Sequence, residues 1–485
     1  MAMNVIYVSP EAVPFSKTGG LADVAGALPN ALKAHGCAVC MFLPLHRQTA
    51  AGGFKLTDTG ITVVVPIGKK EVKGRVLKSV ETGIDAYFIR CDEYFDRAHL
   101  YTTPEGDYPD NLERFAFFSR GVLEAVKALG IRPGIIHAND WQTGLIPAYL
   151  KDVYGQDTFF SRATAVFTVH NMAYQGLFPA SLYETTGLSK GLFTLRGLEF
   201  WGKISLIKAG IVYSDAITTV SRQYALEIQT PLYGCGLEGV LKERKGDLHG
   251  ILNGADYNEW NPATDKLIPA NYSQEDMKGK AACKKELVKR FGLKLKAVAP
   301  VIGMVSRFTH QKGFDLVALS APELMKLDIG VVILGTGDRK YQLIAEEMAA
   351  AHQGRLCVKA AFDNALAHLI EAGSDLFLMP SLYEPCGLNQ IYSLKYGTIP
   401  VVRATGGLED TVKAYPLAGA TGFKFKEYSA HALVGKVKEA IAVFKDKKAW
   451  RALQEAAMKE DFSWQGSALR YLELYEVTAK IPPKT

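Results

Sequence analysis

Residues 375–380 (DLFLMP) and 382–390 (LYEPCGLNQ) form the stretch from which the fold of this chain is predicted. The first run is apolar almost throughout, as is typical of a buried parallel strand. The second contains a carboxylate, a proline and a glycine, and it leads into a helix predicted over residues 389–396. A turn of this composition, between a strand end and a helix start, is typical of a ligand-binding loop in an α/β sheet.

The turn offers two kinds of binding group. Backbone N–H groups at Cys386, Gly387 and Leu388 can bind an oxyanion or sugar hydroxyls, and Glu384 can accept hydrogen bonds from sugar hydroxyls. The alternative is that Glu384 only caps the helix that follows. The rest of the chain decides between these interpretations.

Length and composition restrict the class of protein. The chain has 485 residues, more than one hydrophobic core usually serves, which predicts two domains. The net charge of +6 is small for this length, and no arginine-rich run indicates nucleic-acid binding. No apolar run approaches the ~20 residues of a membrane helix, and the chain enters a strand pattern at once. We therefore expect no signal peptide, no membrane span and a cytoplasmic location.

The seven cysteines are scattered and odd in number, which argues against a disulfide framework. Cys37 and Cys40 form one C-x-x-C pair beside a strand predicted over residues 39–43. Residues three apart on a strand point to opposite faces, and no second pair exists. We interpret both cysteines as core residues rather than as zinc or redox groups.

The first half opens with a strand over residues 4–8 (NVIYV) and a helix whose apolar residues recur three and four apart over residues 21–32. Lys17, Gly19 and Gly20 lie at the start of this helix. Free N–H groups, glycines that allow close approach and an adjacent positive charge suit a diphosphate. The order of residues is neither that of a Walker P-loop nor G-x-G-x-x-G, and ordinary turn chemistry is the alternative.

Further strands are predicted over residues 61–65, 85–89, 134–138 and 164–169, separated by helical segments such as residues 111–129. This alternation predicts a doubly wound α/β sheet with ligands at the carboxyl ends of the strands. Asp140 follows one strand and His170 follows the next. Because successive strands are often neighbours, we expect these two side chains to lie close together. For each alone, a capping or purely structural hydrogen bond is the alternative.

The second half repeats this plan. A strand over residues 248–252 ends in a turn sequence (NGAD, 253–256), and the polar region after it is the predicted domain boundary. A strand over residues 300–305 is then followed by Arg307, Lys312 and a helix. Later strands complete a second α/β sheet, and they are predicted over residues 330–334, 356–359, 375–380 and 399–402. We predict domains over residues 1–256 and 257–460, followed by a C-terminal helical segment over residues 461–485.

Two domains of one plan, each with basic groups at strand ends, predict a cleft in which Lys17, Arg307 and Lys312 converge on one polyanion. A set of solvated surface charges is the alternative. The glycine turn at residues 405–408 (TGGL) is either structural or part of the same site.

Six motifs occur in a fixed order: residues 17–23 (KTGGLAD), 168–171 (TVHN), 252–254 (LNG), Arg307 with 312–313 (KG), 384–388 (EPCGL) and 405–408 (TGGL). In order and spacing they resemble the bacterial glycogen synthases and plant starch synthases, nearly from end to end. The resemblance implies the glycosyltransferase-B fold, in which two Rossmann-like domains face a deep cleft and a C-terminal helix crosses back to the first domain. It also implies transfer of glucose from ADP-glucose to the non-reducing end of an α-1,4-glucan, with retention of configuration and without a metal or cofactor.

The resemblance implies roles for individual residues. The catalytic set would be Lys17, Asp140, His170, Arg307, Lys312 and Glu384. Arg307 and Lys312 would neutralise the ADP leaving group, and His170 would lie against the reacting sugar with Asp140 orienting the site. Lys17, Gly19 and Gly20 would bind donor phosphate. Glu384 and the amides of residues 386–388 would hold the glucosyl hydroxyls.

The implied substrate-binding set is larger. Phe362 falls where similar enzymes place an aromatic ring against adenine, and Trp141 and Tyr174 would be neighbours of the sugar. The full set is Lys17, Gly19, Gly20, Glu11, Asn253, Phe362, Cys386, Gly387, Leu388 and Thr405. Leu382, Tyr383, Asn389 and Gln142 depart from the commonest family pattern. The backbone amides can bind whatever side chain stands at Asn389, and the other three departures put substrate affinity and acceptor preference in question but not the reaction class.

Alternatives remain open. A retaining transferase that uses UDP-glucose or another acceptor is a second enzyme. A catalytically silent glucan-binding or scaffold protein is a second class, although the leaving-group cations speak against it. A phosphorylase is disfavoured, since no pyridoxal-lysine motif is recognisable. We predict same-face attack rather than a covalent adduct on Glu384, because no second carboxylate with an evident base role accompanies it in the turn. The sequence predicts no oligomeric state.

Overall fold

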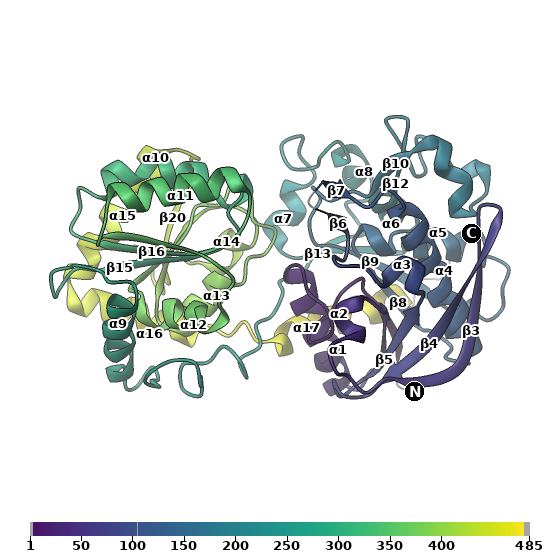
Figure 1. Cartoon of the computed structure of the whole chain (residues 1–485), viewed down its shortest axis with the longest axis horizontal. Coiled ribbons are helices and arrows are strands. Elements are labelled where there is room, and N and C mark those ends of the chain that lie inside the picture. The colour runs from purple at the N-terminus through teal and green to yellow at the C-terminus, as the bar shows by residue number, and fades with distance from the viewer. Residues whose placement is uncertain (1–2, 104, 480–485) are drawn as a thin grey trace. The chain divides into compact units, whose positions relative to one another are not determined.

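The structure is a computed structural model that describes residues 3–103 and 105–479, and it forms two compact units (Figure 1). The first unit comprises the described residues of 1–220, 225–254 and 464–485, and the second comprises residues 221–224 and 255–463. The chain therefore leaves the first unit, builds the second and returns to the first with its last helix.

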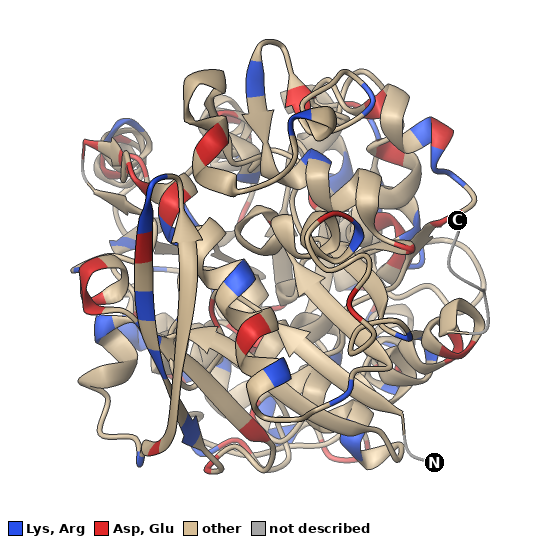
Figure 2. Ribbon diagram, turned by 90° about the vertical axis from the view of Figure 1, so that its right-hand side faces the viewer, with Lys and Arg blue, Asp and Glu red and all other residues tan. Residues whose placement is uncertain are grey.

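The first unit is built on a nine-stranded sheet in the order β14-β13-β9-β8-β1-β2-β5-β4-β3. The strands from β14 to β5 are parallel, and β4 and β3 are antiparallel additions at one edge. The strands are β1 (Asn4–Val8), β2 (Ala38–Pro44), β3 (Thr57–Ile67), β4 (Lys70–Ser79), β5 (Asp85–Arg90), β8 (Ile135–Asn139), β9 (Thr164–Val169), β13 (Ala216–Thr219) and β14 (Leu248–Gly250). Charged residues occur along the β3–β4 hairpin (Figure 2), as is usual where a sheet edge faces solvent.

Helices cover both faces of this sheet (Figure 1). On one face, α1 (Gly20–Ala34) and α17 (Trp464–Ala479) share a core with Val5, Tyr7 and Ile135 of the sheet. On the other lie α4 (Asn111–Ala128), α5 (Leu145–Lys151) and α6 (Leu206–Tyr213). The helix predicted over residues 111–129 is confirmed. The shorter helices are α2 (Arg47–Ala50), α3 (Asp92–Phe95), α7 (Arg222–Glu227) and α8 (Glu238–Glu243).

Two small sheets were not predicted from the sequence. β10 (Leu177–Pro179), β12 (Lys203–Ser205) and β11 (Glu199–Phe200) pair in that order as an antiparallel ribbon. β6 (Thr102–Thr103) and β7 (Gly106–Asp107) form a two-stranded pair. Strands of two or three residues are too short to show an apolar alternation, so their pairing depends on tertiary contacts.

The second unit contains a six-stranded parallel sheet in the order β17-β16-β15-β18-β19-β20. Helices α10, α11 and α15 contribute to the core on one face, and α9 and α12 contribute to the core on the other. The strands are β15 (Val301–Val305), β16 (Gly330–Gly335), β17 (Leu356–Ala360), β18 (Leu376–Met379), β19 (Ile399–Arg403) and β20 (Phe423–Phe425). The helices are α9 (Lys278–Arg290), α10 (Phe314–Leu324), α11 (Arg339–Ala351), α12 (Asn364–Gly373), α13 (Asn389–Lys395), α14 (Gly406–Thr411), α15 (Ala430–Lys445) and α16 (Lys447–Lys459).

The last helix is a core element of the first unit. Ala468, Tyr471 and Tyr475 of α17 are fully buried, and the Tyr475 hydroxyl lies 2.6 Å from Nδ1 of the buried His137. These side chains, spaced three and four residues apart, thus face the sheet.

The interpretation of Cys37 and Cys40 as core residues is confirmed. Cys37 and Cys40 are buried, and all seven cysteines are free. Among the described residues, no helix is long and apolar enough to cross a membrane.

Candidate active site

The turn before α1 is organised by a buried carboxylate. Glu11 is only 2% exposed, and one of its oxygens accepts hydrogen bonds from the backbone N–H and the hydroxyl of Thr18, both at 2.7 Å. Burial raises the pKa of Glu11 to about 7. The structure therefore places Glu11 beneath the glycine turn that it supports.

Lys17, in contrast, lies on the surface of this turn. Its Nζ is 2.6 Å from Oδ1 of Asp23, and both side chains are partly exposed. A side chain added at Gly19 or Gly20 would meet no atom within 4 Å, so the space in front of both backbones is open. An exposed ammonium beside open backbone can meet an anion without rearrangement of the core.

Asp140 and His170 lie together, as predicted. β8 and β9 pair directly, and the His170 backbone N–H donates to Asp140 Oδ1 at 2.7 Å. Burial raises the pKa of Asp140 to about 7, and the Glu11 charge adds to this effect. Asp140 has φ of 56°, a sparsely populated conformation for a residue other than glycine, and such conformations cluster at functional sites.

His170 is neutral near pH 7. Its Nε2 lies 3.0 Å from Asn139 Oδ1, and burial lowers the pKa of the ring to about 3. An imidazole of this kind can hydrogen-bond to a sugar hydroxyl, and it carries no proton to donate as an acid near neutrality. Asn139 itself is held by a bond from its amide to the backbone oxygen of Val8.

Three further predicted residues of the first unit lie in the segments that follow its strands. Asn253, just beyond β14, is buried, and its Oδ1 has no hydrogen-bond partner among the described residues. A buried polar atom without a partner marks a position where a ligand or water can bind. Trp141 is largely buried after β8, whereas Tyr174 is half exposed.

In the second unit, Lys312 and Glu384 form one ion pair. Lys312 Nζ lies 2.8 Å from Oε1 and 2.6 Å from Oε2 of Glu384. The Ser381 hydroxyl donates to Glu384 Oε2 at 3.0 Å, and Glu384 is only 3% exposed. Both carboxylate oxygens are therefore held by a cation, an arrangement in which they accept hydrogen bonds rather than attack a carbon atom.

Arg307 is exposed at the end of β15, and its guanidinium has no hydrogen-bond or ion-pair partner among the described residues. The loop thus presents one exposed guanidinium together with the ammonium of Lys312 at the carboxyl end of a central strand. Two cations at such a position favour an anionic ligand.

The glycine turn before α14 packs against the backbone of the Glu384 turn. The Gly407 N–H donates to the Glu384 oxygen at 3.0 Å. An added Cβ at Gly406 would lie 1.9 Å from that oxygen, and one at Gly407 would lie 2.0 Å from the Cys386 oxygen. Only glycine fits, because the opposing atoms are backbone. The two turns are therefore one rigid structure.

The remaining predicted residues of the second unit lie in these two turns or in the loop before α12. Backbone N–H groups of Gly387 and Leu388 precede α13 and have no partner among the described residues. Cys386 is buried in the same turn, and Thr405 is buried at the start of α14. Phe362 is 86% exposed before α12, so its ring is available for stacking.

The sequence did not indicate the residues that support the site. Thr18, Asn139 and Ser381 each bond to a predicted site residue. All three lie within the loops or strand ends that were singled out. The only feature of the sequence that could have indicated this supporting role is a polar side chain in a segment next to a buried strand.

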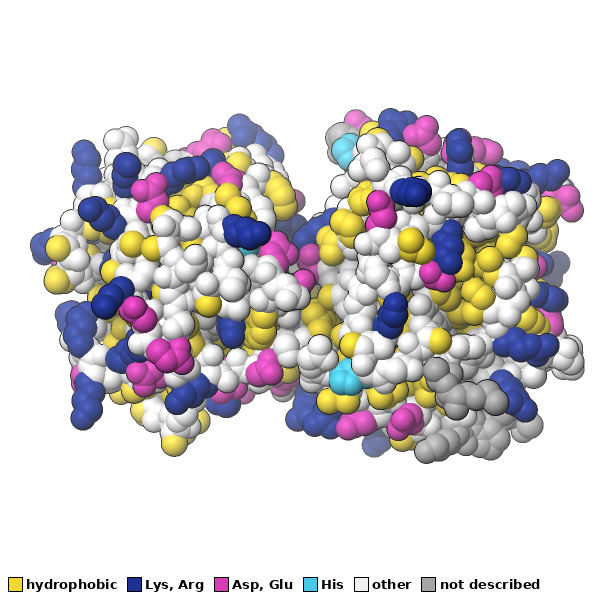
Figure 3. All heavy atoms as spheres, turned by 90° about the horizontal axis from the view of Figure 1, so that it is seen from below, with side chains coloured by type: hydrophobic (Ala, Val, Ile, Leu, Met, Phe, Trp, Pro, Cys, Tyr) yellow, Lys and Arg dark blue, Asp and Glu magenta, His cyan; other side chains and the backbone are white. Residues whose placement is uncertain are grey.

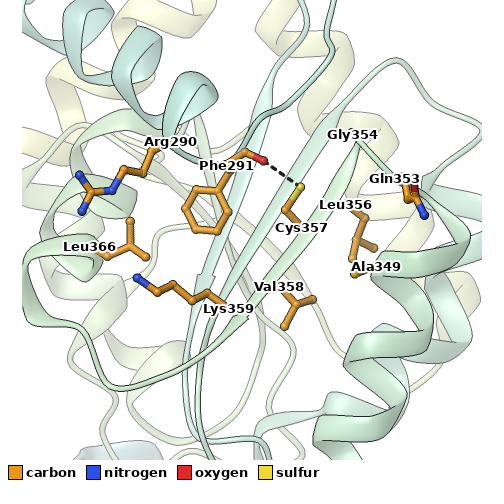
Figure 4. A pocket seen from close by; sticks show the side chains of 10 residues that line it. All are labelled: Arg290, Phe291, Ala349, Gln353, Gly354, Leu356, Cys357, Val358, Lys359 and Leu366. Atoms are coloured by element: carbon orange, nitrogen blue, oxygen red, sulfur yellow. Dashed lines mark hydrogen bonds between the residues drawn. The ribbon is translucent and has the colours of Figure 1, made fainter.

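Other features lie apart from these residues. A cavity of about 480 Å³ lies along β17, where Cys357 Sγ contacts the Phe291 oxygen at 3.2 Å (Figure 4), and no predicted site residue lines it. Lys and Arg are interspersed with Asp and Glu on the face that Figure 3 shows. Within the described ranges, no cluster of three or more His, Cys, Asp or Glu side chains is placed to hold a metal ion.

Comparison with known proteins covers both units. Residues 4–243 match the family described as the starch synthase catalytic domain, and residues 287–459 match the glycosyl transferases group 1. The chain is 49% identical over 481 residues to a glycogen synthase of Koribacter versatilis, covering 99% of each chain. It is 47% identical over 478 residues to one of Geotalea daltonii, covering 98% of this chain and 99% of the relative.

Solved structures show the same fold. The catalytic domain of starch synthase IV from Arabidopsis thaliana, bound to ADP and acarbose, superposes with a TM-score of 0.91 at 31% identity, covering 99% of this chain and 100% of that one. Sucrose-phosphate synthase from Thermosynechococcus elongatus superposes with a TM-score of 0.57 at 19% identity, covering 98% of each chain, which shows the fold alone. The predicted glycosyltransferase-B fold is confirmed.

Proposed function

The chain belongs to the family of glycogen and starch synthases, and on that premise we propose that it transfers glucose from ADP-glucose to the non-reducing end of an α-1,4-glucan with retention of configuration. The observation that carries this proposal is the full-length similarity to glycogen synthases, because it includes both units. The cation-bearing turns of the second unit support it, since a protein that only bound glucan would not need them.

The proposal assigns the donor to charged and amide groups. Arg307 and Lys312 stabilise the negative charge that develops on the leaving ADP, and removal of one such group commonly costs ~3 kcal/mol of barrier. Lys17, with the Gly19 and Gly20 backbone, contacts donor phosphate. Phe362 stacks on the adenine, and Thr405 and the amides of residues 386–388 complete the donor site together with Glu384.

The proposed chemistry is same-face substitution. The bond between the anomeric carbon and the phosphate oxygen breaks, and ADP leaves with the electron pair. The acceptor O4 then forms the new bond to that carbon, and its proton passes to the oxygen of the leaving phosphate. The pairing of Glu384 with Lys312 supports this route, because both carboxylate oxygens already accept hydrogen bonds.

His170 and Asp140 position the reacting sugar in this proposal. A neutral His170 can accept or donate one bond to a hydroxyl, and Asp140 fixes the His170 backbone at 2.7 Å. Glu11 supports the turn that carries Lys17, and Asn253 offers its buried Oδ1 to the substrate. No metal or cofactor takes part in the proposed reaction, and we propose a cytoplasmic location.

The decisive experiment is a transfer assay with the purified chain, radiolabelled ADP-glucose and glycogen. Glucose incorporated as α-1,4-linked residues, in chelator as well as in buffer, is the expected result. Preference for UDP-glucose would assign the other donor, and no transfer from either donor would overturn the proposal. Glu384→Gln tests the role of the Glu384 carboxylate, because this variant keeps the shape of the side chain and removes its charge. A trapped covalent glucosyl-Glu384 in the wild type would replace same-face attack by double displacement.

A further inference from the structure

The ribbon β10-β12-β11 ends in a tight hairpin with an unusual residue at its tip. Phe200 of β11 pairs with Lys203 of β12, which leaves Trp201 and Gly202 as a two-residue loop. Their φ angles are 52° and 73°. Two consecutive positive φ values are the signature of a type I′ turn, which favours Asn-Gly because asparagine and glycine tolerate this conformation.

Tryptophan gains nothing in folding from this position. A bulky residue at positive φ is strained, by a cost of ~1–2 kcal/mol, and Trp201 is 82% exposed, so burial does not offset the strain. Its only aromatic neighbour among the described residues is Phe200, at 6.2 Å between ring centroids. Backbone strain that persists at an exposed aromatic residue is typical of a ligand-binding position.

The hairpin is continuous with the strand ends that carry the candidate site. The rings of Phe178 in β10 and Trp141 lie 6.0 Å apart, and Trp141 directly follows Asp140. Phe178 pairs with Ile204 of β12. Trp201 lies three residues before Ile204, in the turn that joins β11 to β12. The ribbon therefore leads from the base of the Asp140 loop to the exposed indole.

A second segment fixes the hairpin to the same loops. Gln175 donates from Nε2 to the Cys235 oxygen at 2.9 Å. An added Cβ at Gly236 would lie 2.9 Å from Cζ of Phe200 and 3.5 Å from Nε1 of Trp201. Gly236 thus packs against the hairpin close to its tip. Tyr174, which precedes Gln175 in the chain, is half exposed.

We propose that Trp201 binds the α-1,4-glucan acceptor at a distance from the transferred glucose and so favours long acceptors over short ones. The flat indole packs on the apolar C–H face of a glucose residue, while its N–H stays free for a hydroxyl. A polymer reaches both Asp140 and Trp201, whereas a short oligosaccharide held at the transfer site does not extend to the tip. This inference rests on the proposed function for its ligand.

The test uses two variants of the full-length protein with opposite expectations. Trp201→Asn removes the ring and supplies the residue that the turn prefers, so its Tm equals or exceeds that of the wild type. Trp201→Tyr keeps an aromatic face. We expect Trp201→Asn to lower the ratio of kcat/KM for glycogen to that for maltotriose about tenfold, equivalent to ~1.4 kcal/mol of contact free energy, and Trp201→Tyr to retain most of the ratio. Val80→Asn, a change at another exposed apolar residue of the first unit, is the control and leaves the ratio unchanged.

Calorimetric titration with maltoheptaose, without donor, separates this inference from the proposed function. Loss of maltoheptaose binding in Trp201→Asn supports the inference even if the wild type transfers no glucose. An unchanged ratio and unchanged maltoheptaose binding in Trp201→Asn overturn the inference, even if the wild type is an active synthase. The wild type could instead self-associate in a concentration-dependent way. If only Trp201→Asn abolished this self-association and left glucan binding intact, the tip would be assigned to a second copy of the chain and the inference would equally be overturned.

Discussion

Replacing Gly407 by alanine tests how far the rate of glucose transfer depends on the position of the Glu384 turn, as distinct from the stability of the second unit. The added Cβ would lie 2.0 Å from the Cys386 oxygen and 2.6 Å from the Cys386 Cα, both backbone atoms, whereas ordinary contact begins at 3.4 Å. The α14 turn and the Glu384 turn must therefore separate by about 1.4 Å, the difference between these two distances. Gly407 has no positive φ, so steric contact is the only cause of the change.

The expected loss is large in rate and moderate in stability. A displacement of ~1 Å at a catalytic group costs about 10²-fold in rate, so kcat for glucose transfer should fall by about two orders of magnitude. Overpacking of this kind costs about 1–3 kcal/mol, and each kcal/mol lowers the Tm of a unit of this size by about 2–4 °C. Transfer of labelled glucose is measured well below the Tm, which is followed by calorimetry.

Gly419→Ala is the matched control. Gly419 has φ of 71° and nothing within 4 Å of an added Cβ, so this change introduces backbone strain without a clash. We expect a loss of ~1–2 kcal/mol in stability and an unaltered kcat. Gly407→Ala with more than about a tenth of the wild-type kcat would refute the steric reasoning. An equal loss of kcat in Gly419→Ala would show that destabilisation, not positioning, lowers the rate.

Three further predictions follow from the ion pair, the buried carboxylate and the exposed ring. Lys312→Met removes the cation from Glu384, which then keeps only the Ser381 hydroxyl among the partners that the described residues offer. Transfer should therefore slow by ~10²–10³-fold, and the Tm should fall because a buried carboxylate loses its cation. The double variant Lys312→Met/Glu384→Gln should recover part of that Tm loss, and no recovery would contradict a compensating pair. Because burial raises the pKa of Asp140 to about 7, its contribution to stability is present below the ordinary carboxyl pKa and is lost as pH rises through about 7. We therefore compare the free energy of unfolding of Asp140→Asn with that of the wild type by urea unfolding, and the difference should favour the variant more at pH 8 than at pH 5. An equal difference at both pH values would count against the raised pKa of Asp140. Phe362→Ala should raise the KM for ADP-glucose about tenfold, ~1.4 kcal/mol, with Phe362→Tyr near wild type; equal KM values in both would remove the ring from the donor site.

The sequence was informative where strands are long and buried on both faces. β9 is buried at every position and β8 likewise, so their continuous apolar runs predicted two central strands. Once the strands are central and successive, the polar residues after them must meet at one sheet edge, which is why the proximity of Asp140 and His170 was predictable. Lys312 and Glu384 were each placed at a strand end by the same reasoning.

The sequence did not predict hydrogen bonds and ion pairs that form only when separate loops meet in the folded chain. Lys312 and Glu384 are 72 residues apart, and nothing in either loop indicates that they bind one another. Glu11 reads as a loop residue, and only the folded turn shows that its carboxylate is buried under Thr18. The Trp201 hairpin was missed because its strands have two and three residues and its turn lacks the Asn-Gly pair that reveals such turns.

The return of α17 to the first unit sets the order in which this protein can be completed during translation. Tyr471 and Tyr475 fill the core beneath β1 and β8, yet the ribosome makes them after the whole of the second unit. The second unit has its complete sheet as soon as residues 255–463 have emerged, whereas the first is completed only by residues 464–479, and Tyr7 and His137 stay uncovered until then. A nascent chain arrested before residue 464 would therefore be a preferred client for chaperones that recognise exposed aromatic surface.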